Sequence, residues 1–353
     1  MKKDVIEIAF LGDISLNNGY ADLKSNPFSE VSGVCKNADY AVGNLEALLK
    51  GNEGFNLEKR PFLFAEENAF QWLPKLNLNL VSTAHNHVYD NFDSGYTNSL
   101  RFLNKHKIDY LGSGFNTEAT APFFVNIKGK KIAFLNYCHS NTNFKKPKAT
   151  SIHLNVYDSN IIIDEIEKTK EQADIIILLL HWGGKSDYGN FPKMDQVKDA
   201  QRFIDAGADA IIGHHAHCIQ PVEYYNGKPI AYCLGNFCFD DIDCEGKISH
   251  LRNSGKNGII VQLFIGDKTI KIKWKGVKNK HLNILPASSI KLKVYLINLV
   301  FKFYKRSTLI RKLHEKYMKK LEPLLFYIET TKFNVVAFVF HRIYIKAKRK
   351  LTN

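Results

Sequence analysis

Short apolar runs, separated by polar segments that contain glycine, recur through the first three quarters of the chain. Runs of this length, rich in Ile, Val and Leu and closed by polar residues, are typical of buried strands. We therefore expect strands at 5–11, 38–42, 78–83, 131–136, 174–180, 208–212 and 230–234, and a hairpin at 258–274 that turns at Gly266 and Asp267.

Four stretches between these runs space their apolar residues as a helix does. Tyr96, Leu100 and Leu103, for example, recur at three- and four-residue intervals, which places them on one side of a helix. We expect helices near 68–73, 95–105, 161–170 and 195–206, the last ending at Gly207. Strands that alternate with helices in this way predict an α/β fold.

The charge of the chain is concentrated in its last part. The 353 residues carry a net charge of +14. Residues 277–353 hold 18 Lys/Arg against 3 Asp/Glu, or +15, which leaves 31 against 32, or −1, for residues 1–276. This break in composition predicts a globular domain at 1–276, with 45% apolar residues in the whole chain to build a core, and a basic extension at 277–353.

The basic extension predicts amphipathic helices. Residues 290–304 are apolar except for Lys291, Lys293, Asn298 and Lys302, and apolar residues recur at four-residue spacing within 309–321. A third apolar stretch, 333–345, leads into further basic residues. Two interpretations stay open: the helices pack on the body with their lysines in solvent, or residues 290–350 bind an anionic membrane surface. No nucleic-acid partner is expected, because no groove-reading motif is present.

The sequence indicates a reducing compartment. Its six cysteines show no Cys-x-x-Cys spacing, so we expect free thiols and no thiolate zinc site. Asp4 and Glu7 interrupt the start of the chain, which disfavours a signal peptide, and no apolar run approaches the roughly 20 residues of a membrane span. We expect a cytoplasmic protein, located on the inner face of the membrane if the extension is an anchor.

Five of the predicted strands end in residues of the kind that bind metals: Asp13; Asn44 and Glu46; His85, Asn86 and His87; His181; and His214, His215 and His217. Ligands of α/β proteins collect at the carboxyl ends of strands, so we expect these ends to face one crevice. Carboxylate, amide and imidazole groups without thiolate favour Mn, Fe or Zn, and about six of them favour two divalent ions. Singly, each end has a plainer interpretation as a strand cap, an Asx turn or a core histidine.

Several short motifs of the chain resemble those of a known family. The motifs are Gly12 Asp13, Gly43 Asn44 Leu45 Glu46, Asn86 His87 with Asp90, His181 Trp182 Gly183, Gly213 His214 His215 Ala216 His217 with Gln220, and Leu234 Gly235 Asn236 Phe237. In order and spacing they resemble the CapA-type poly-gamma-glutamate capsule biosynthesis proteins, a branch that looks like calcineurin-like metallophosphoesterases, over roughly residues 5–276.

The resemblance implies a four-layer αββα sandwich of the metallophosphoesterase type, with metals at the strand ends. Carried over residue by residue, it implies metal ligands at Asp13, Glu46, Asn86, His181, His215 and His217. It implies that His87 is the general acid, held by Asp90. Residues of the surrounding shell, or in contact with substrate, would be Asn44, His85, Tyr188, His214, Gln220 and Asn236.

The sequence departs from the family pattern at four places. Ser15 stands where wider phosphoesterases have a histidine, and Glu46 supplies a longer arm than their aspartate; both are typical of the CapA branch. His85 is peculiar to this chain, because the branch usually has asparagine there, and it could be an extra ligand or a donor behind the ligands. Two residues are inserted before Tyr188.

Two functions from different classes follow. The first is a metal-dependent hydrolase of the phosphoesterase type that acts on an anionic or lipid-linked intermediate in the biosynthesis of a capsule or other surface polymer. The second is a non-catalytic, metal-binding subunit of a machine for polymer synthesis or export. The presence of both His87 and Asp90 favours the first, because a scaffold needs no proton donor. The same residues are compatible with cleavage of a phosphoester, an ester or an amide bond.

Overall fold

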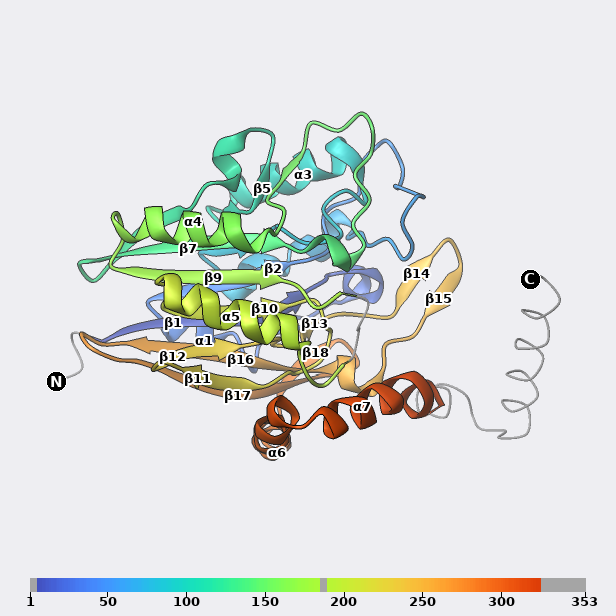
Figure 1. Ribbon diagram of the computed structural model, residues 1–353. Helices are drawn as coiled ribbons and strands as arrows, with labels where there is room; N and C mark the ends of the chain where they lie inside the picture. The colour runs from blue at the N-terminus through green and yellow to red at the C-terminus, as the bar shows by residue number, and fades with distance from the viewer. Residues whose placement is uncertain (1–4, 185–188, 325–353) are drawn as a thin grey trace. The chain divides into compact units, whose positions relative to one another are not determined.

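Two β-sheets form the centre of the fold in a computed structural model that describes residues 5–184 and 189–324 (Figure 1). The chain divides into two compact units, Met1–Phe301 and Lys302–Asn353. Both sheets lie in the first unit. The predicted strands and the predicted hairpin all overlap strands of these sheets, so the predicted α/β class is confirmed, although five further sheet strands among the described residues were not predicted.

The larger sheet has eight strands in the order β18-β17-β16-β1-β2-β3-β4, with β13 also paired to β1. Strands β1 to β4 are parallel, and β16 to β18 continue the sheet in antiparallel pairs. The strands are β1 (Ile6–Ile14), β2 (Tyr40–Leu45), β3 (Leu80–Ser82), β4 (Asp109–Leu111), β13 (Asn236–Cys238), β16 (Asn257–Ile265), β17 (Ile270–Lys280) and β18 (Asn283–Pro286).

The second sheet has six strands in the order β11-β12-β10-β9-β7-β6. Its four central strands are parallel, and its outer strands are antiparallel. The strands are β6 (Phe123–Ile127), β7 (Lys130–Cys138), β9 (Ile175–His181), β10 (Ala210–His214), β11 (Val222–Tyr225) and β12 (Lys228–Ala231). Two small ribbons pair β5 (Ser113–Gly114) with β8 (His153–Leu154) and β14 (Ile242–Cys244) with β15 (Lys247–Ser249).

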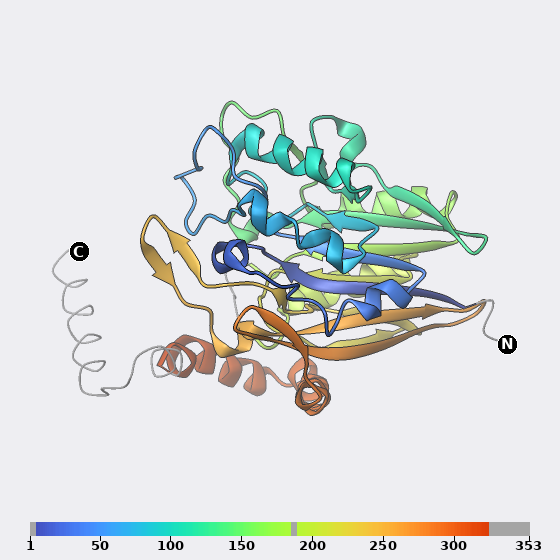
Figure 2. The ribbon, with the colours of Figure 1, turned by 180° about the vertical axis from the view of Figure 1, so that it is seen from behind.

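Helices cover the outer faces of the two sheets. The helices of this unit are α1 (Gly33–Asn37), α2 (Glu67–Phe70), α3 (Phe92–Lys105), α4 (Ser159–Lys170) and α5 (Met194–Ala206), and short 3₁₀ segments lie at Asn18–Asp22, Leu73–Leu76, Thr117–Thr120, Ser140–Thr142 and Asn253–Lys256. Tyr96 and Leu103 of α3 pack with Val81 of β3. Helix α4 contacts β9 and α5, which lie in front in Figure 1, and Figure 2 brings the helices of the first half of the chain to the front.

The main core lies between the sheets. Because side chains alternate along a strand, Ile8 and Phe10 of β1 point to one face and pack with Phe134 of β7 and Ile177 of β9. Alternate residues, such as Ala9 and Leu11, join the core under the helices instead. The four layers are therefore helices, sheet, sheet and helices, which confirms the predicted sandwich of the metallophosphoesterase type.

The basic part of the chain does not begin at a structural break. The change of charge at 276/277 falls inside β17, which pairs with β16 from Ile270 to Lys278 and with β18 beyond it. Helix α6 (Ser289–Arg306) follows, and its residues Ile290 and Val294 belong to the core between the sheets. The first compact unit consequently extends to Phe301.

The second unit contains helix α7 (Thr308–Lys316) and a wider turn at Tyr317–Leu321. These elements match the amphipathic stretch expected at 309–321, and the Ser307 hydroxyl caps α7 by accepting from the amide of Ile310. The third predicted stretch, 333–345, lies outside the described residues. Within 5–184 and 189–324, no helix combines the length and the apolar character that crossing a bilayer requires.

Candidate metal centre

The end of β1 brings Asp13 and Asn44 together. Strands β1 and β2 pair in parallel, and Asp13 is directly opposite Asn44 in the register. The Asn44 amide donates to Asp13 Oδ1 at 2.9 Å, and the Ser82 hydroxyl donates to Asn44 Oδ1 at 2.9 Å. All three side chains are buried. Asn44 thus orients the Asp13 carboxylate, as the shell around a metal ligand does.

Strand β1 changes its neighbour just before Asp13. It pairs with β16 from Ile6 to Phe10 and with β13 at Asp13 and Ile14. This change of neighbour brings the backbone of Gly12 close to that of Gly235, so that a Cβ added to Gly12 would lie 2.0 Å from the carbonyl oxygen of Gly235. The Asp13 amide donates to that same carbonyl at 3.1 Å. Glycine at position 12 therefore allows the backbone contact that fixes Asp13.

The second sheet contributes His181 and His214. Strands β9 and β10 are parallel, and these two residues are directly opposite each other at their carboxyl ends. His214 Nδ1 lies 3.0 Å from Asp13 Oδ1, so the two sheets are joined at the site. His181 Nε2 lies 2.8 Å from the side-chain oxygen of Asn86. The strand ends of both sheets thus converge, as the sequence predicts.

The turn after β10 places His215 and His217 at the same point. Both residues have positive φ, 92° and 51°, a conformation that is uncommon outside glycine and clusters at functional sites. His217 Nδ1 lies 2.9 Å from the side-chain oxygen of Asn236. His215 Nε2 lies 2.9 Å from the carbonyl of Gly184, and its ring centre is 4.8 Å from that of His181.

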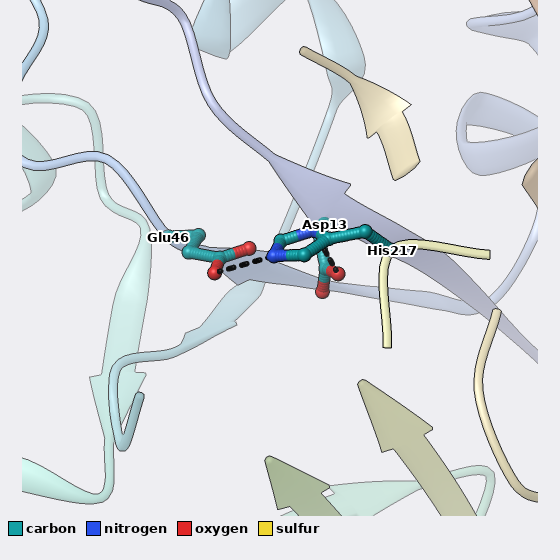
Figure 3. A group of neighbouring side chains, drawn as sticks. All are labelled: Asp13, Glu46 and His217. Carbon is teal, nitrogen blue, oxygen red and sulfur yellow. Dashed lines mark ion pairs between the residues drawn. The ribbon is translucent and has the colours of Figure 1, made fainter. Parts of the chain in front are cut away.

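Glu46 is central to the group. Its Oε1 atom lies 3.7 Å from Nε2 of His217 and 3.8 Å from Nε2 of both His87 and His181. His217 Nδ1 lies 3.6 Å from Asp13 Oδ2, so His217 contacts both carboxylates (Figure 3). One ligand atom from each of Asp13, Glu46 and His217 lies within 4.8 Å of the others. Two buried carboxylates and a partly buried imidazole nitrogen fit a transition metal.

Burial lowers the pKa of two histidines at this site and so favours their neutral forms. The pKa of His181 is well below its ordinary value, first because of burial and then because of the neighbouring histidines. Burial also lowers the pKa of His85 to about 3. Burial alone would raise the pKa of Asp13, but hydrogen bonding and charge from His214 hold it below its ordinary value. Neutral imidazole and ionised carboxylate are the forms that bind metals.

His87 lies in a buried group of three residues that includes Lys59. His87 Nδ1 lies 2.5 Å from Asp90 Oδ2 and 2.6 Å from Lys59 Nζ, and Lys59 Nζ lies 3.1 and 3.3 Å from the two Asp90 oxygens. The side chains of Lys59 and Asp90 are 2% and 0% exposed. Burial and then the charge of Lys59 lower the pKa of His87 to about 4, while Asp90 acts in the opposite direction.

Lys59 was not identified from the sequence. It is one of 49 Lys and Arg residues and lies in an irregular segment between β2 and α2. A fully buried lysine would have indicated a charged partner, because lysines are almost never fully buried unless paired. The burial of a residue in a loop, however, cannot be predicted from sequence periodicity. His87 Nδ1 can accept from Lys59 or donate to Asp90, and this choice sets which nitrogen of His87 carries the proton.

His85 contacts the backbone of His87. Its Nδ1 atom accepts from the backbone amide of His87 at 3.1 Å. A neutral ring that accepts at Nδ1 carries its proton at Nε2, and that buried nitrogen has no hydrogen-bond partner among the described residues. Of the two roles expected for His85, this geometry favours a donor behind the ligands.

The other residues predicted to surround the metal or contact the substrate do not all lie at the site. Asn236 links His217 to the carbonyl of Gly255, which its amide reaches at 2.9 Å. Gln220 instead donates to the carbonyl of Gly189 at 2.8 Å, a contact that ties two loops together. Tyr188 lies outside the described residues. The structure therefore brings together the six predicted ligands, His87 and Asp90, with Asn44, His85, His214 and Asn236 around them.

Comparison with known proteins identifies the family of the chain. Residues 7–241 match the family model "Bacterial capsule synthesis protein PGA_cap". The chain is 31% identical over 246 residues to the PGA biosynthesis protein CapA of Bacillus subtilis, and 27% identical over 275 residues to the capsule biosynthesis protein CapA of Bacillus anthracis. The matches cover 67% and 72% of this chain and 64% and 66% of those relatives, so the chain spans slightly less than two thirds of either relative's length.

A solved structure supports the fold. A Staphylococcus aureus protein assigned as a 5'-nucleotidase superposes with a TM-score of 0.50 at 13% identity, over 80% of this chain and 54% of that one. At this identity the similarity concerns the fold alone, and the family follows from the sequence matches. The resemblance inferred from the motifs is thereby confirmed, and the chain belongs to the CapA-type family of bacterial capsule synthesis proteins.

Proposed function

We propose that this protein is a metal-dependent hydrolase of the phosphoesterase type that acts in the biosynthesis of a capsule or another surface polymer. The observation that carries the proposal is the convergence on Glu46 of three imidazoles from three different strand ends, next to the Asp13 carboxylate. Ordinary core packing does not bury two carboxylates among several histidines, because each buried charge needs a compensating cation.

The ligand set would be Asp13, Glu46, Asn86, His181, His215 and His217, with Mn, Fe or Zn as the metal and two ions as the preferred number. A bound transition metal supplies Lewis-acid activation of water and of the bond to be cleaved. The chain supplies the rest. Asn44 and His214 orient Asp13, Asn236 orients His217, and the strand-end geometry keeps these groups together in a buried site.

His87 is proposed as the proton donor to the leaving group. Its Nε2 atom faces Glu46 at 3.8 Å, while its Nδ1 atom contacts Asp90 and Lys59. The two contacts at Nδ1 fix the ring so that Nε2 is presented to the site, which is the arrangement that a general acid requires. Asp90 is itself held by the amide of Leu63 at 2.7 Å.

The polymer context comes from the family, whose named members act in capsule and poly-gamma-glutamate synthesis. We propose an anionic or lipid-linked polymer intermediate as the substrate, since the site is cationic when it holds metal ions. The second candidate, a non-catalytic metal-binding subunit of a polymer-synthesis machine, keeps the same metal centre and lacks turnover.

The decisive experiment measures hydrolysis of aryl phosphomonoesters, phosphodiesters and carboxylic esters by the protein loaded with Mn, Fe or Zn. His87→Asn should retain the metal and lower turnover by roughly a hundredfold or more, with a smaller loss for substrates whose leaving groups are good. His153→Asn, at an exposed histidine on β8, is the matched control. Metal binding without turnover on any of the three classes would favour the non-catalytic subunit.

A further inference from the structure

Helix α6 has two apolar faces. Its inner face is fixed on the first unit: Ile290 and Val294 belong to the core, and the Phe301 ring packs edge-on against Tyr232 with ring centres 5.5 Å apart. Asn298, on the same side, accepts from the backbone amide of Val222 at 2.8 Å. The spacing of these four residues is that of one helix face, so the orientation of α6 up to Phe301 is determined by the core.

The opposite face of α6 is apolar and exposed. We name it the outer α6 face, and it consists of Leu292, Tyr295, Leu296, Leu299 and Val300, which are 41% to 63% exposed. Because successive residues of a helix are about 100° apart around its axis, the middle of this face lies roughly opposite Val294. Folded proteins rarely leave a continuous apolar patch in solvent without a partner for it.

The margins of the outer α6 face are basic. On the same helical geometry, Lys291 and Lys293 lie at its two edges, one on each side. The 18 residues of α6 contain five Lys or Arg and no Asp or Glu. An apolar stripe one helix wide between lysines is the pattern of a helix that lies in a membrane interface, where lysine stems extend toward the headgroups.

We propose that the outer α6 face binds the surface of a membrane that contains anionic lipid. The charge argues for lipid over a second copy of this chain, because two such basic faces would repel each other, whereas anionic headgroups complement them. The core contacts of the inner face then hold the whole first unit at the membrane. The proposal is independent of the proposed hydrolase activity, since it uses none of the site residues.

The test measures binding of the full chain to vesicles of phosphatidylcholine, with and without an equal part of phosphatidylglycerol, by co-sedimentation. Binding should require phosphatidylglycerol. It should weaken as salt rises from about 0.1 M to about 1 M, because the Debye length falls from about 10 Å to about 3 Å.

Two double variants separate the apolar and basic contributions. Lys291→Gln with Lys293→Gln should lower the partition coefficient by about thirtyfold, since each basic side chain near an anionic surface contributes about fivefold. Leu296→Ser with Leu299→Ser should lower it at least tenfold. Ile161→Ser, at an exposed apolar residue of α4, is the matched control and should bind as the parent does.

Other outcomes would overturn the proposal. Equal binding to both kinds of vesicle would show that charge has no part in it, and absence of binding would remove lipid as the partner. Binding by both double variants at the level of the parent would assign the interaction to another part of the chain. A lower melting temperature or a changed oligomeric state in the leucine variant would show that protein covers the outer α6 face. Unchanged melting with reduced binding supports the proposal.

Discussion

Replacing Lys59 with methionine is the sharpest test of the electrostatics at the site. The change removes the ammonium and keeps most of the side-chain volume. Asp90 would then remain buried and ionised without the cation that lies 3.1 Å away. Removing one partner of a buried ion pair destabilises a protein by about 3–5 kcal/mol, because the other charge is left uncompensated. The matched control is Lys50→Met, whose pair with Glu66 is about half exposed and should change stability by at most about 1 kcal/mol.

The loss caused by Lys59→Met should depend on pH through His87. In the parent, burial and Lys59 lower the pKa of His87 to about 4. Without Lys59 this pKa rises, since Asp90 still favours the imidazolium and the ammonium no longer opposes it. A charged His87 can then pair with Asp90 in place of Lys59. The loss should therefore shrink as the pH falls from about 8 to about 5, by up to about 1.4 kcal/mol per pH unit in the interval where His87 is charged in the variant and neutral in the parent.

The measurement is urea unfolding of the chelator-treated parent, Lys59→Met and Lys50→Met proteins at the two pH values. A loss in Lys59→Met no larger than that in Lys50→Met would refute the buried pair. A large loss that is the same at both pH values would refute the coupling between Lys59 and His87.

Three further predictions concern the metal, the acid stability and the extent of the domain. Protein purified without chelator should carry one to two equivalents of Mn, Fe or Zn by elemental analysis. Asp13→Ala or His217→Ala should lower that metal content while the circular dichroism spectrum stays unchanged. Full metal content in both variants would contradict the ligand set. His85 should destabilise the metal-free protein as the pH falls below about 6.5, which is the pKa of His85 in the unfolded chain. The loss should reach about 2 kcal/mol at pH 5, because the unfolded chain takes up a proton that the buried ring, with its pKa of about 3, does not. His85→Asn should remove that part of the pH dependence in urea unfolding, and an unchanged pH dependence would exclude this role of His85. A chain that ends at Gly276 should fail to show a cooperative thermal transition, since it loses the buried residues Val277, Ile284, Ile290 and Val294, worth about 1.5–3 kcal/mol each, whereas a chain that ends at Arg306 should melt cooperatively.

Most of the sheet strands, and the convergence of their ends, could be predicted because both depend on local pattern. Apolar runs identify strands, and parallel strands bring their carboxyl ends to one edge, so Asp13, Glu46, His181 and His217 could be grouped without coordinates. The pairing partners could not be derived in this way. That β13 replaces β16 as the neighbour of β1 near Asp13 depends on long-range register, which short apolar runs do not specify.

Two other features, the burial of Lys59 and the roles of the two faces of α6, could not be predicted from the local sequence pattern, each for a different physical reason. Lys59 reaches His87 from an irregular loop, and only the three-dimensional path of that loop buries it. In α6, a single helix period cannot distinguish an inner apolar face from an outer one, and the sequence therefore left packing and membrane binding as alternatives. In the first unit, the inner face packs, as Ile290 and Val294 show, and the outer face remains available.

The crowding at Gly12 affects how mutations in this protein should be interpreted. Gly12 contributes no side chain to the site, yet any substitution there must push the Gly235 carbonyl and, with it, the amide contact of Asp13. In a random mutagenesis screen, replacements at Gly12 would be scored together with those of the proposed metal ligands, although Gly12 has no side chain that could bind a metal. Laboratory evolution would therefore have almost no freedom in the backbone beneath Asp13, whichever side chains around it are varied.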